Sequence, residues 1–439
     1  LLKNNGILPL KKENIKTIGI VGPNADSRKA LIGNYHGTAS RYITIQEGIQ
    51  DYVGEDVRIL SSVGSELFRD RTEPLAFSRD RLAEAKIVAE NSDVVILCVG
   101  LDETLEGEEG DTGNSYASGD KETLQLPQVQ LDLMEAMAGS GKPVVLCLMA
   151  GSDIDMSYAA EKFDAVMVLW YPGSQGGKAA AKILFGENSP SGKLPVTFYE
   201  SLEELPEFTD YSMKGRTYRY MEGKAQFPFG YGLTYSNVKV ENAEVRQCGR
   251  QITVEAEVYN KGNADTEEVV QVYVGKPESE LEQPEKELVF FEKTKELLPG
   301  EEQKISVHVP VKVLTSYSEE KAAYILSKGY YRIYVGNSIE AAECGGFDEE
   351  ETRIIKQVTN LLCCDCKFTR LSKTNPDDTW PTGAHSGVVK NKLTFLPYEK
   401  RKHYPAKFDV EKPKEKVTFD AVRKNPSRAA EFVAQMSPE

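Results

Sequence analysis

The side chains best suited to acid–base chemistry are crowded into one short segment. Residues 102–111 hold six carboxylates, and the string L-E-G-E-E-G-D at 105–111 is the densest part. A positioned carboxyl group can deliver or accept a proton, and neighbouring like charges raise the pKa of one member of such a group because they disfavour its ionisation. The segment is therefore a candidate site for general acid–base chemistry, and the alternative interpretation is a solvated acidic loop.

The elements around this segment predict where it lies. It directly follows an apolar, β-branched run typical of a buried parallel strand. In open α/β sheets, ligands bind beyond the carboxyl ends of the strands. The first 200 residues alternate strand and helix patterns, which predicts a doubly wound α/β sheet with strands at 17–22, 57–60, 92–100, 143–151 and 164–173 and helices at 82–91, 127–140 and 175–185.

The second half of the chain has a different pattern of predicted secondary structure. After an α/β domain at 1–235, strands follow one another without helices, several alternate polar with apolar residues, and turn signals separate them. This pattern predicts a β-sandwich of immunoglobulin or fibronectin type III-like fold at 236–350. Residues 351–428 are rich in Pro, Lys and Glu and are predicted to be a long connector, and residues 429–439 return to a helical pattern.

Charge and composition argue against several classes of partner. The chain has 53 basic and 68 acidic side chains, a net charge of −15, and its basic residues are scattered. We therefore expect no binding to nucleic acid or to anionic membranes. No apolar run approaches the ~20 residues of a transmembrane helix. Gly22-Pro23-Asn24 after the first strand lacks a dinucleotide or phosphate-loop motif, and we predict no cofactor.

The seven cysteines favour a reducing compartment, and we expect a cytoplasmic location. Cys98 and Cys147 lie inside apolar strand patterns, where they are predicted to be small core residues. Cys363, Cys364 and Cys366 form a C-C-x-C cluster, but no paired C-x-x-C or nearby histidine completes a four-ligand site. We therefore predict no bound metal.

A series of motifs occurs in a fixed order: L-L-K-N-N-G-I-L-P-L (1–10), V-G-P-N-A-D (21–26), G-N-Y-H-G-T (33–38), L-W-Y-P-G-S-Q-G-G (169–177), S-G-K-L-P-V-T-F (191–198), G-R-T-Y-R-Y (215–220) and F-P-F-G-Y-G-L-T-Y-S (227–236). Together they resemble glycoside hydrolase family three, the exo-acting β-glucosidases and β-xylosidases. The first motif resembles the segment that leaves the family's (β/α)₈ barrel. The strand-rich part after these motifs is similar to the family's fibronectin-like domain.

The resemblance implies a role for the acidic segment. Family members carry their acid/base glutamate in a loop that follows a strand of the α/β domain, in patterns such as E-G-x-D-R or E-A-E-x-x-D-R. The matching position here is Glu108, and Glu106 and Glu109 are near alternatives because the acids are so dense. The sequence departs from the pattern at Thr112, where the family has arginine, and Lys121 or another base is expected to do the work of that arginine.

Four other residues are candidates for substrate binding, and each also has a structural interpretation. Trp170 ends a strand at the same sheet edge but could pack between domains. Arg216 and Tyr218 are polar enough to line a cleft, although an interdomain salt bridge would explain them equally. His36 could reach substrate from a loop flanked by glycines. None of the four is predicted to be catalytic.

The second carboxylate of the pair is expected elsewhere. The family's nucleophile is an aspartate in an S-D-W motif on the barrel, and no S-D-W occurs in this sequence. Residues 429–439 resemble the opening of that barrel, whereas residues 1–10 resemble the segment that leaves it. The resemblance thus implies a permuted order, with the barrel downstream of residue 439 or on a second chain.

The expected function is that of a retaining exo-β-glycosidase. The leading hypothesis is a β-glucosidase that releases terminal β-D-glucose from cello-oligosaccharides or aryl glucosides, and the alternative within the family is a β-xylosidase. From another class, the chain could be a non-catalytic carbohydrate-binding or structural module. Its acidic segment speaks against this, because a binding face would more naturally show exposed aromatic residues on the β domain. A homo-oligomer is possible.

Overall fold

The computed structural model describes residues 1–70, 77, 79–108, 121–211, 213–248, 251–279, 281, 283–359 and 415–435. Glu109, Thr112 and the C-C-x-C cluster at 363–366 lie outside the described residues. Residues 1–357 belong to one compact unit, and residues 415–435 belong to another.

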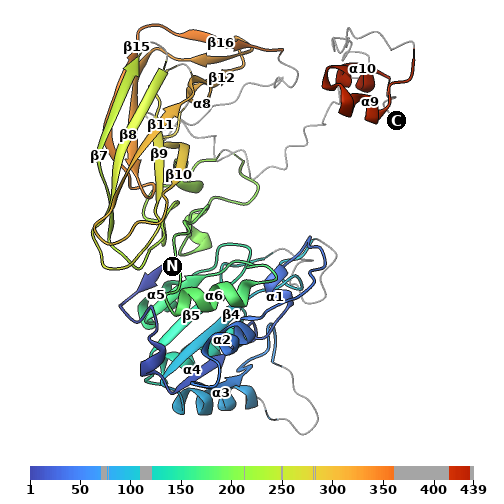
Figure 1. Ribbon diagram of the computed structural model, residues 1–439, viewed down its shortest axis with the longest axis vertical. Coiled ribbons are helices and arrows are strands. Elements are labelled where there is room, and N and C mark those ends of the chain that lie inside the picture. The colour runs from blue at the N-terminus through green and yellow to red at the C-terminus, as the bar shows by residue number, and fades with distance from the viewer. Residues whose placement is uncertain are drawn as a thin grey trace. The chain divides into compact units, whose positions relative to one another are not determined.

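The first domain is built on a six-stranded sheet with strand order β1-β6-β5-β4-β2-β3 (Figure 1). Its strands are β1 (Lys3–Asn4), β2 (Thr17–Val21), β3 (Arg58–Ser62), β4 (Val94–Gly100), β5 (Val144–Met149) and β6 (Ala165–Val168). Strands β2 to β6 are parallel, and β1 pairs antiparallel with β6 at one edge. The predicted doubly wound sheet is confirmed. The short polar strand β1 was not predicted, because two residues carry no periodicity.

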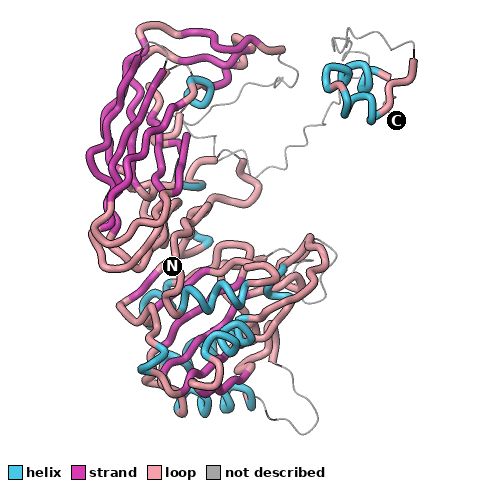
Figure 2. Tube along the Cα trace, in the orientation of Figure 1, coloured by secondary structure: helices cyan, strands magenta, loops and turns pink. Residues whose placement is uncertain are grey.

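Helices cover both faces of this sheet, because successive strand residues point to opposite faces and both sets are apolar (Figure 2). One face packs against α1 (Lys29–Ile32), α2 (Ile45–Val53) and α6 (Gly176–Leu184). The other packs against α3 (Asp80–Glu90), α4 (Gln128–Ala138) and α5 (Ser157–Lys162). Helix α2 begins at a capping box in which Thr44 and Glu47 bond each other's backbone amides.

Two buried thiols mark the centre of the sheet. Cys98 in β4 and Cys147 in β5 are directly opposed in the parallel register, and both are fully buried, which confirms their predicted place in the core. A hydrogen bond with Cys147, together with burial, raises the pKa of the Cys98 thiol.

The second domain is an antiparallel sandwich with a core of its own. One sheet has the order β10-β9-β14-β15, a second β11-β8-β7, and a small third β12-β13-β16. The bounds of its elements are β7 (Val238–Cys248), β8 (Gln251–Asn260), β9 (Val269–Gly275), β10 (Glu287–Lys293), β11 (Glu302–Val309), α8 (Val311–Leu314), β12 (Ser316–Ser318), β13 (Ala323–Leu326), β14 (Gly329–Gly336), β15 (Ala342–Glu349) and β16 (Arg353–Gln357). Because β16 pairs with β13, strand pairing continues past residue 350 into the predicted connector.

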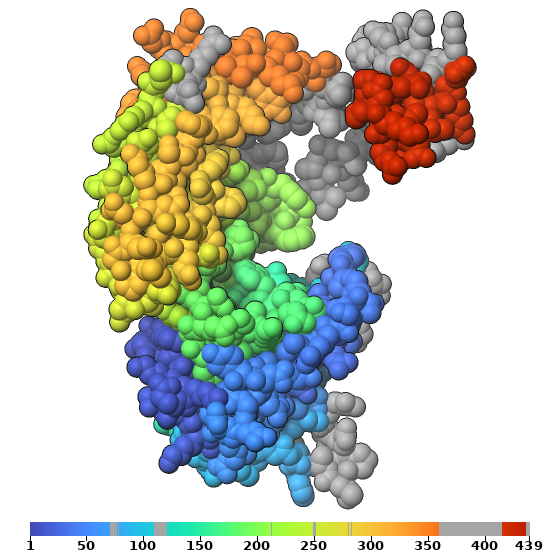
Figure 3. Space-filling view, in the orientation of Figure 1, coloured from blue at the N-terminus to red at the C-terminus, as the bar shows by residue number. Residues whose placement is uncertain are grey.

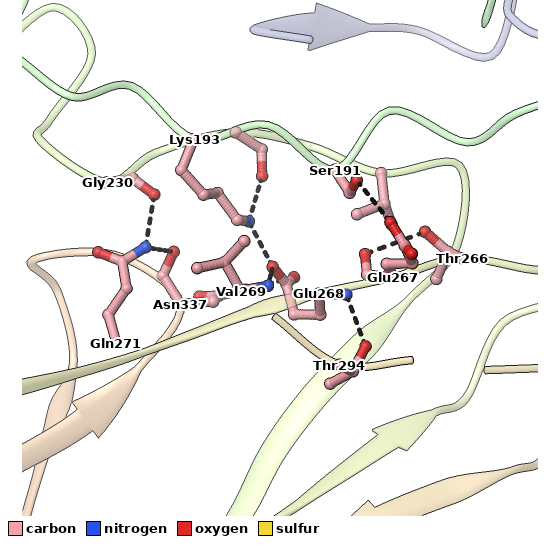
Figure 4. Close-up of polar contacts among 12 residues, drawn as sticks. Ser191, Lys193, Gly230, Thr266, Glu267, Glu268, Val269, Gln271, Thr294 and Asn337 are labelled. Atoms are coloured by element: carbon pink, nitrogen blue, oxygen red, sulfur yellow. Dashed lines mark hydrogen bonds and ion pairs between the residues drawn. The ribbon is translucent and has the colours of Figure 1, made fainter. Parts of the chain in front are cut away.

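The two domains are joined by polar contacts that the sequence did not suggest (Figure 4). Lys193 Nζ, in the stretch that follows α6, lies 2.8 Å from Oε1 of Glu268, which directly precedes β9 of the sandwich. The side-chain amide of Gln271 donates to the carbonyl oxygens of Gly230 (3.1 Å) and Asn337 (2.8 Å). The contacts from Lys193 to Glu268 and from Gln271 to Gly230 therefore join the α/β domain to the sandwich at β9, whereas the bond to Asn337 lies within the sandwich.

Figure 3 shows the outer surface of the α/β domain and of the sandwich in space-filling form. The separate C-terminal unit contains α9 (Phe419–Lys424) and α10 (Ala429–Ala434), with Phe419 and Phe432 in edge contact at 6.1 Å between ring centroids. Helix α10 falls where the sequence predicted a helical pattern. In the described part of the chain, no helix combines the length and the apolar character needed to cross a membrane.

Candidate active site

The acidic segment begins with a tightly bonded turn directly after β4. The Asp102 carboxylate accepts hydrogen bonds from the Thr104 amide (2.8 Å) and hydroxyl (2.6 Å). The backbone amides of Leu105 and Glu106 both donate to the Asp102 carbonyl oxygen, at 3.0 and 2.9 Å. Short-range bonds therefore fix the first residues of the segment at the carboxyl end of the strand, where the sequence placed them.

The Glu106 carboxylate is held by three donors from two other strand ends. After β5, the Gly151 amide donates to Oε2 at 2.7 Å and the Ser152 hydroxyl donates to Oε1. After β6, the Tyr171 hydroxyl donates to Oε2. Because hydrogen bonds that involve a charged partner are stronger than neutral ones, these contacts tie the acidic segment firmly to its neighbours.

The Tyr171 ring is seated between two glycines. A Cβ atom added to Gly33 would lie 2.4 Å from the ring, and one added to Gly151 would lie 2.9 Å from it, so a larger residue at either position would push the ring away. Burial, and then the charge of Glu106, raise the pKa of Tyr171 well above its usual range, so its hydroxyl stays a donor. The preceding Trp170 has a φ of 54°, a conformation that an aromatic residue rarely adopts.

Lys121 and Asp153 are in contact near Glu106. The Lys121 ammonium donates to the Asp153 carbonyl oxygen at 2.6 Å. Asp153 Oδ2 accepts from the Tyr199 amide at 2.9 Å, while its buried Oδ1 has no partner among the described residues. Burial raises the pKa of Asp153 to about 6 and lowers that of Lys121. The Lys121 ammonium is thus close enough to Glu106 and Asp153 to interact with their charges, and its replacement of the family's arginine stays a prediction.

A third contact joins the acidic segment to α1 and the loop that follows it. Lys29 Nζ lies 3.0 Å from Glu103 Oε1, and His36 Nε2 lies 3.6 Å from Glu103 Oε2. The hydrogen bond from Lys29 is the main cause of a lowered pKa at Glu103. The predicted candidate His36 is therefore brought to the same sheet edge as the acidic segment.

The three predicted acid/base candidates differ in their surroundings. Glu108 is exposed and comes two residues after the anchored Glu106. Glu106 is half-buried and accepts hydrogen bonds at both carboxylate oxygens. Glu109 lies outside the described residues. A side chain whose oxygens are already engaged is less free to reach a substrate oxygen, so of the two described candidates Glu108 has the freer carboxyl group, and the acid/base role stays a prediction.

Two of the predicted substrate-binding residues have structural partners of their own. The Arg216 guanidinium donates to the carbonyl oxygens of Pro206 (3.2 Å), Glu207 (2.7 Å) and Asp210 (3.2 Å), which holds the preceding loop. Tyr218, in α7 (Thr217–Tyr220), makes its contacts elsewhere: it stacks on Phe229 at 4.2 Å and its hydroxyl accepts from the Leu288 amide of the sandwich. A substrate role for either remains a prediction.

Trp170 is half-buried and packs edge-on against Phe198, with 6.0 Å between the ring centroids. It is adjacent to Tyr171 and contributes to the packing of the domain.

The contacts of the acidic segment that the sequence did not reveal are those of Ser152, Asp153 and Tyr171. Their positions in the sequence could have indicated them, because G-S-D at 151–153 and W-Y at 170–171 lie at the ends of predicted strands. Among the described residues, no group of His, Cys, Asp or Glu could hold a metal ion.

The chain thus combines an α/β domain that carries a strand-end cluster of carboxylates with an antiparallel β-sandwich, and comparison with known proteins gives its family. The model described as "Glycosyl hydrolase family 3 C-terminal domain" matches residues 1–235, and that of the "Fibronectin type III-like domain" matches residues 268–339. The chain belongs to glycosyl hydrolase family 3.

Several family members are similar over most of the chain. A periplasmic β-glucosidase of Salmonella typhimurium is 30% identical over 79% of this chain and 48% of its own length. A β-xylosidase of Formosa agariphila is 32% identical over 78% of this chain and 47% of its own. A crystal structure of a Listeria innocua β-glucosidase with isofagomine superimposes with a TM-score of 0.65 at 28% identity, covering 80% of this chain and 48% of that one. The chain spans about half the length of the relatives it matches.

Proposed function

We propose that this chain carries the general acid/base of a retaining β-glycosidase, with Glu108 in that role and the nucleophile on a (β/α)₈ barrel outside these 439 residues. The observation that carries the proposal is the place of the acidic segment in a family 3 domain. It follows β4 at the carboxyl edge of the sheet, Glu106 is anchored there, and Glu108 is exposed just beyond it.

The chemistry requires one free carboxyl group on this side of the substrate. A protonated Glu108 gives its proton to the glycosidic oxygen while a carboxylate nucleophile attacks the anomeric carbon. In the second step, the Glu108 carboxylate takes a proton from the water that hydrolyses the glycosyl-enzyme. An exposed side chain at a sheet edge can meet a substrate held by another domain.

The sugar we propose is terminal β-D-glucose, from cello-oligosaccharides or aryl glucosides. The Salmonella typhimurium β-glucosidase and the Listeria innocua structure support it. The alternative is a β-xylosidase, which the Formosa agariphila enzyme supports at a closely similar identity. Rates of the assembled enzyme on matched aryl β-D-glucoside and aryl β-D-xyloside distinguish the two.

A permuted domain order is part of the proposal. The relative from Ruminococcus albus, a β-glucosidase, is 29% identical and covers 91% of this chain, which is more than residues 1–359 make up. Its similarity therefore extends past residue 359, into the stretch that precedes the barrel-like residues 429–439. This supports a barrel that follows residue 439 in the same polypeptide.

The deciding experiment is to assay the purified 439-residue chain alone, and then with the polypeptide that follows residue 439. We expect no hydrolysis of aryl β-glucosides by the chain alone and retaining hydrolysis once the downstream polypeptide is added. Retaining activity in the 439 residues alone would refute the division of the two carboxylates. Oligosaccharide binding without hydrolysis in either preparation would instead support a non-catalytic module.

A further inference from the structure

Residues 151–153, directly after β5, hold both Glu106 and Lys121. Glu106 accepts from the Gly151 amide (2.7 Å) and the Ser152 hydroxyl. Lys121 donates to the Asp153 carbonyl oxygen (2.6 Å). Two residues 15 positions apart in the sequence are thus bonded to consecutive residues after β5, so this turn fixes the positions of both.

Tyr171, in the loop after β6, provides a further contact that holds Glu106 in place. Its hydroxyl donates to the same Glu106 oxygen that the Gly151 amide binds. Its ring fits only because Gly33 and Gly151 have no side chains. The end of α1 and the loops after β4, β5 and β6 therefore meet around one phenol ring, and a change at Tyr171 alters a direct contact of the acidic segment.

We propose that Tyr171 and Ser152 are positioning residues that act through Glu106 to place Glu108, an inference that rests on the proposed acid/base role of Glu108. Glu108 comes two positions after Glu106, so the backbone between them spans at most about 7 Å. Fixing the Glu106 carboxylate thus limits the region that the Glu108 carboxyl can sample. A general acid must come within about 3 Å of the atom it protonates, and a misplacement of about 1 Å can cost a factor of about 100 in rate.

The hydrogen bonds of the Glu106 carboxylate are those expected of a residue that anchors the acidic segment. Both of its oxygens accept hydrogen bonds, and they do so from donors that belong to two different loops. The bonds hold the group at the sheet edge rather than in solvent, where a substrate would arrive. Loss of one donor would free the segment without removing a carboxyl group from the site.

The first arm of the test uses the 439-residue chain and needs no enzymatic activity. Hydrogen–deuterium exchange is followed in the peptide that covers residues 101–108 for wild type, Tyr171→Phe and Ser152→Ala. The control is Tyr235→Phe, which removes a similarly buried tyrosine hydroxyl that donates to the Ile183 carbonyl oxygen (2.7 Å) on the opposite core. We expect about tenfold faster exchange in the Tyr171→Phe and Ser152→Ala variants, with an unchanged melting temperature, and no change in that peptide for the control.

The second arm uses the polypeptide extended beyond residue 439. Tyr171→Phe should lower kcat about 10-fold or more for aryl glycosides with poor leaving groups and leave activated ones nearly unchanged, and azide should not rescue it because Glu108 is still present. Unchanged exchange at residues 101–108 in both anchor variants would overturn the positioning role, as would an equal loss on both substrate types. An inactive wild type would refute the proposed function alone, since the exchange arm still reports on the anchor.

Discussion

Lys193 and Glu268 form a buried ion pair between the α/β domain and the sandwich, with 2.8 Å between Nζ and Oε1 and side chains that are 8% and 3% exposed. The remaining polar atoms are also satisfied. Lys193 donates to the Gly232 carbonyl oxygen at 2.7 Å, and the Glu268 carboxylate accepts from the Val269 amide at 2.7 Å and the Asn337 side chain at 3.1 Å (Figure 4). Such a pair is costly to break on one side only.

We predict that Lys193→Met lowers the free energy of unfolding by about 3–5 kcal/mol, because it leaves the Glu268 carboxylate buried without its cation. Urea denaturation followed by fluorescence measures the change. The control is Lys182→Met, which removes an ion pair with Glu187 that is 35% and 46% exposed and should cost under about 1 kcal/mol. Equal losses in the two variants would show that the interdomain pair contributes no more than a surface contact.

The acid/base assignment predicts a specific kinetic pattern for Glu108→Ala in the extended polypeptide. Hydrolysis of substrates with poor leaving groups should fall by about 10²–10⁴, activated aryl glycosides should be affected far less, and added azide should restore turnover as a glycosyl azide. Glu106→Gln should not be rescued by azide, since Glu106 serves as an anchor. Azide rescue of Glu106→Gln together with normal turnover of Glu108→Ala would reverse the two roles.

Asp153 predicts an unusual dependence of stability on pH. Its folded pKa of about 6 exceeds the ordinary 3.8, so the folded state binds the proton more tightly and stability falls as pH rises from 3.8 to 6. Above pH 6 the full cost of the buried charge is present. Asp153→Asn should therefore be more stable than wild type above pH 6, by about 1–2 kcal/mol after allowance for solvent screening, and the difference should vanish as pH falls below 3.8.

Calorimetric melting between pH 3.5 and 8 tests this expectation, and Asp155→Asn is its opposite control. Burial acts to raise the pKa of Asp155, but hydrogen bonds from Ser157, Gln226 and Gln125 outweigh it and lower the pKa. Asp155→Asn should thus destabilise the protein at neutral pH. An Asp153→Asn variant that loses stability at pH 7 would contradict the buried-charge argument.

The close packing of α2 on α6 predicts that one added methyl group lowers the stability of the protein. A Cβ atom on Gly48 would lie 2.1 Å from the carbonyl carbon of Gly177, and backbone atoms cannot move aside as a flexible side chain could. Gly48→Ala should lower stability by about 1–3 kcal/mol or more through overpacking. Gly192→Ala, where no atom lies within 4 Å of the added carbon, should be neutral or slightly stabilising in the same thermal melts.

Much of the fold could be read from local sequence patterns, because buried parallel strands are apolar on both faces and stand out as short runs. The runs at 92–100 and 143–151 became β4 and β5 with small changes at their ends. Helix α2 was missed although its Thr44–Glu47 capping box is a recognisable signal. β1 could not be found this way, since its pairing with β6 joins residues more than 150 positions apart.

The site could be predicted only in part for a related reason. The acidic residues are neighbours in sequence and their strand-end position follows from the run before them, so the place of the segment was predictable. The partners of Glu106 are far from it in the sequence, because Ser152 and Tyr171 follow later strands. In the sequence alone, their hydroxyl groups cannot be distinguished from those of other polar loop residues. The sequence likewise cannot show that Glu106 is engaged while Glu108 is exposed, because both are glutamates in the same short string.

The two opposed thiols at the centre of the sheet can be used to measure how often the core of the α/β domain opens. Cys98 and Cys147 are free and fully buried, whereas Cys248 is free and exposed. A thiol reagent can therefore modify Cys248 in the native state, but it can modify the central pair only when the core between this face of the sheet and helices α1, α2 and α6 opens. Mass spectrometry of the labelled peptides would give the rate of that opening in the unaltered protein, with the Cys248 peptide as the reference for reagent reactivity.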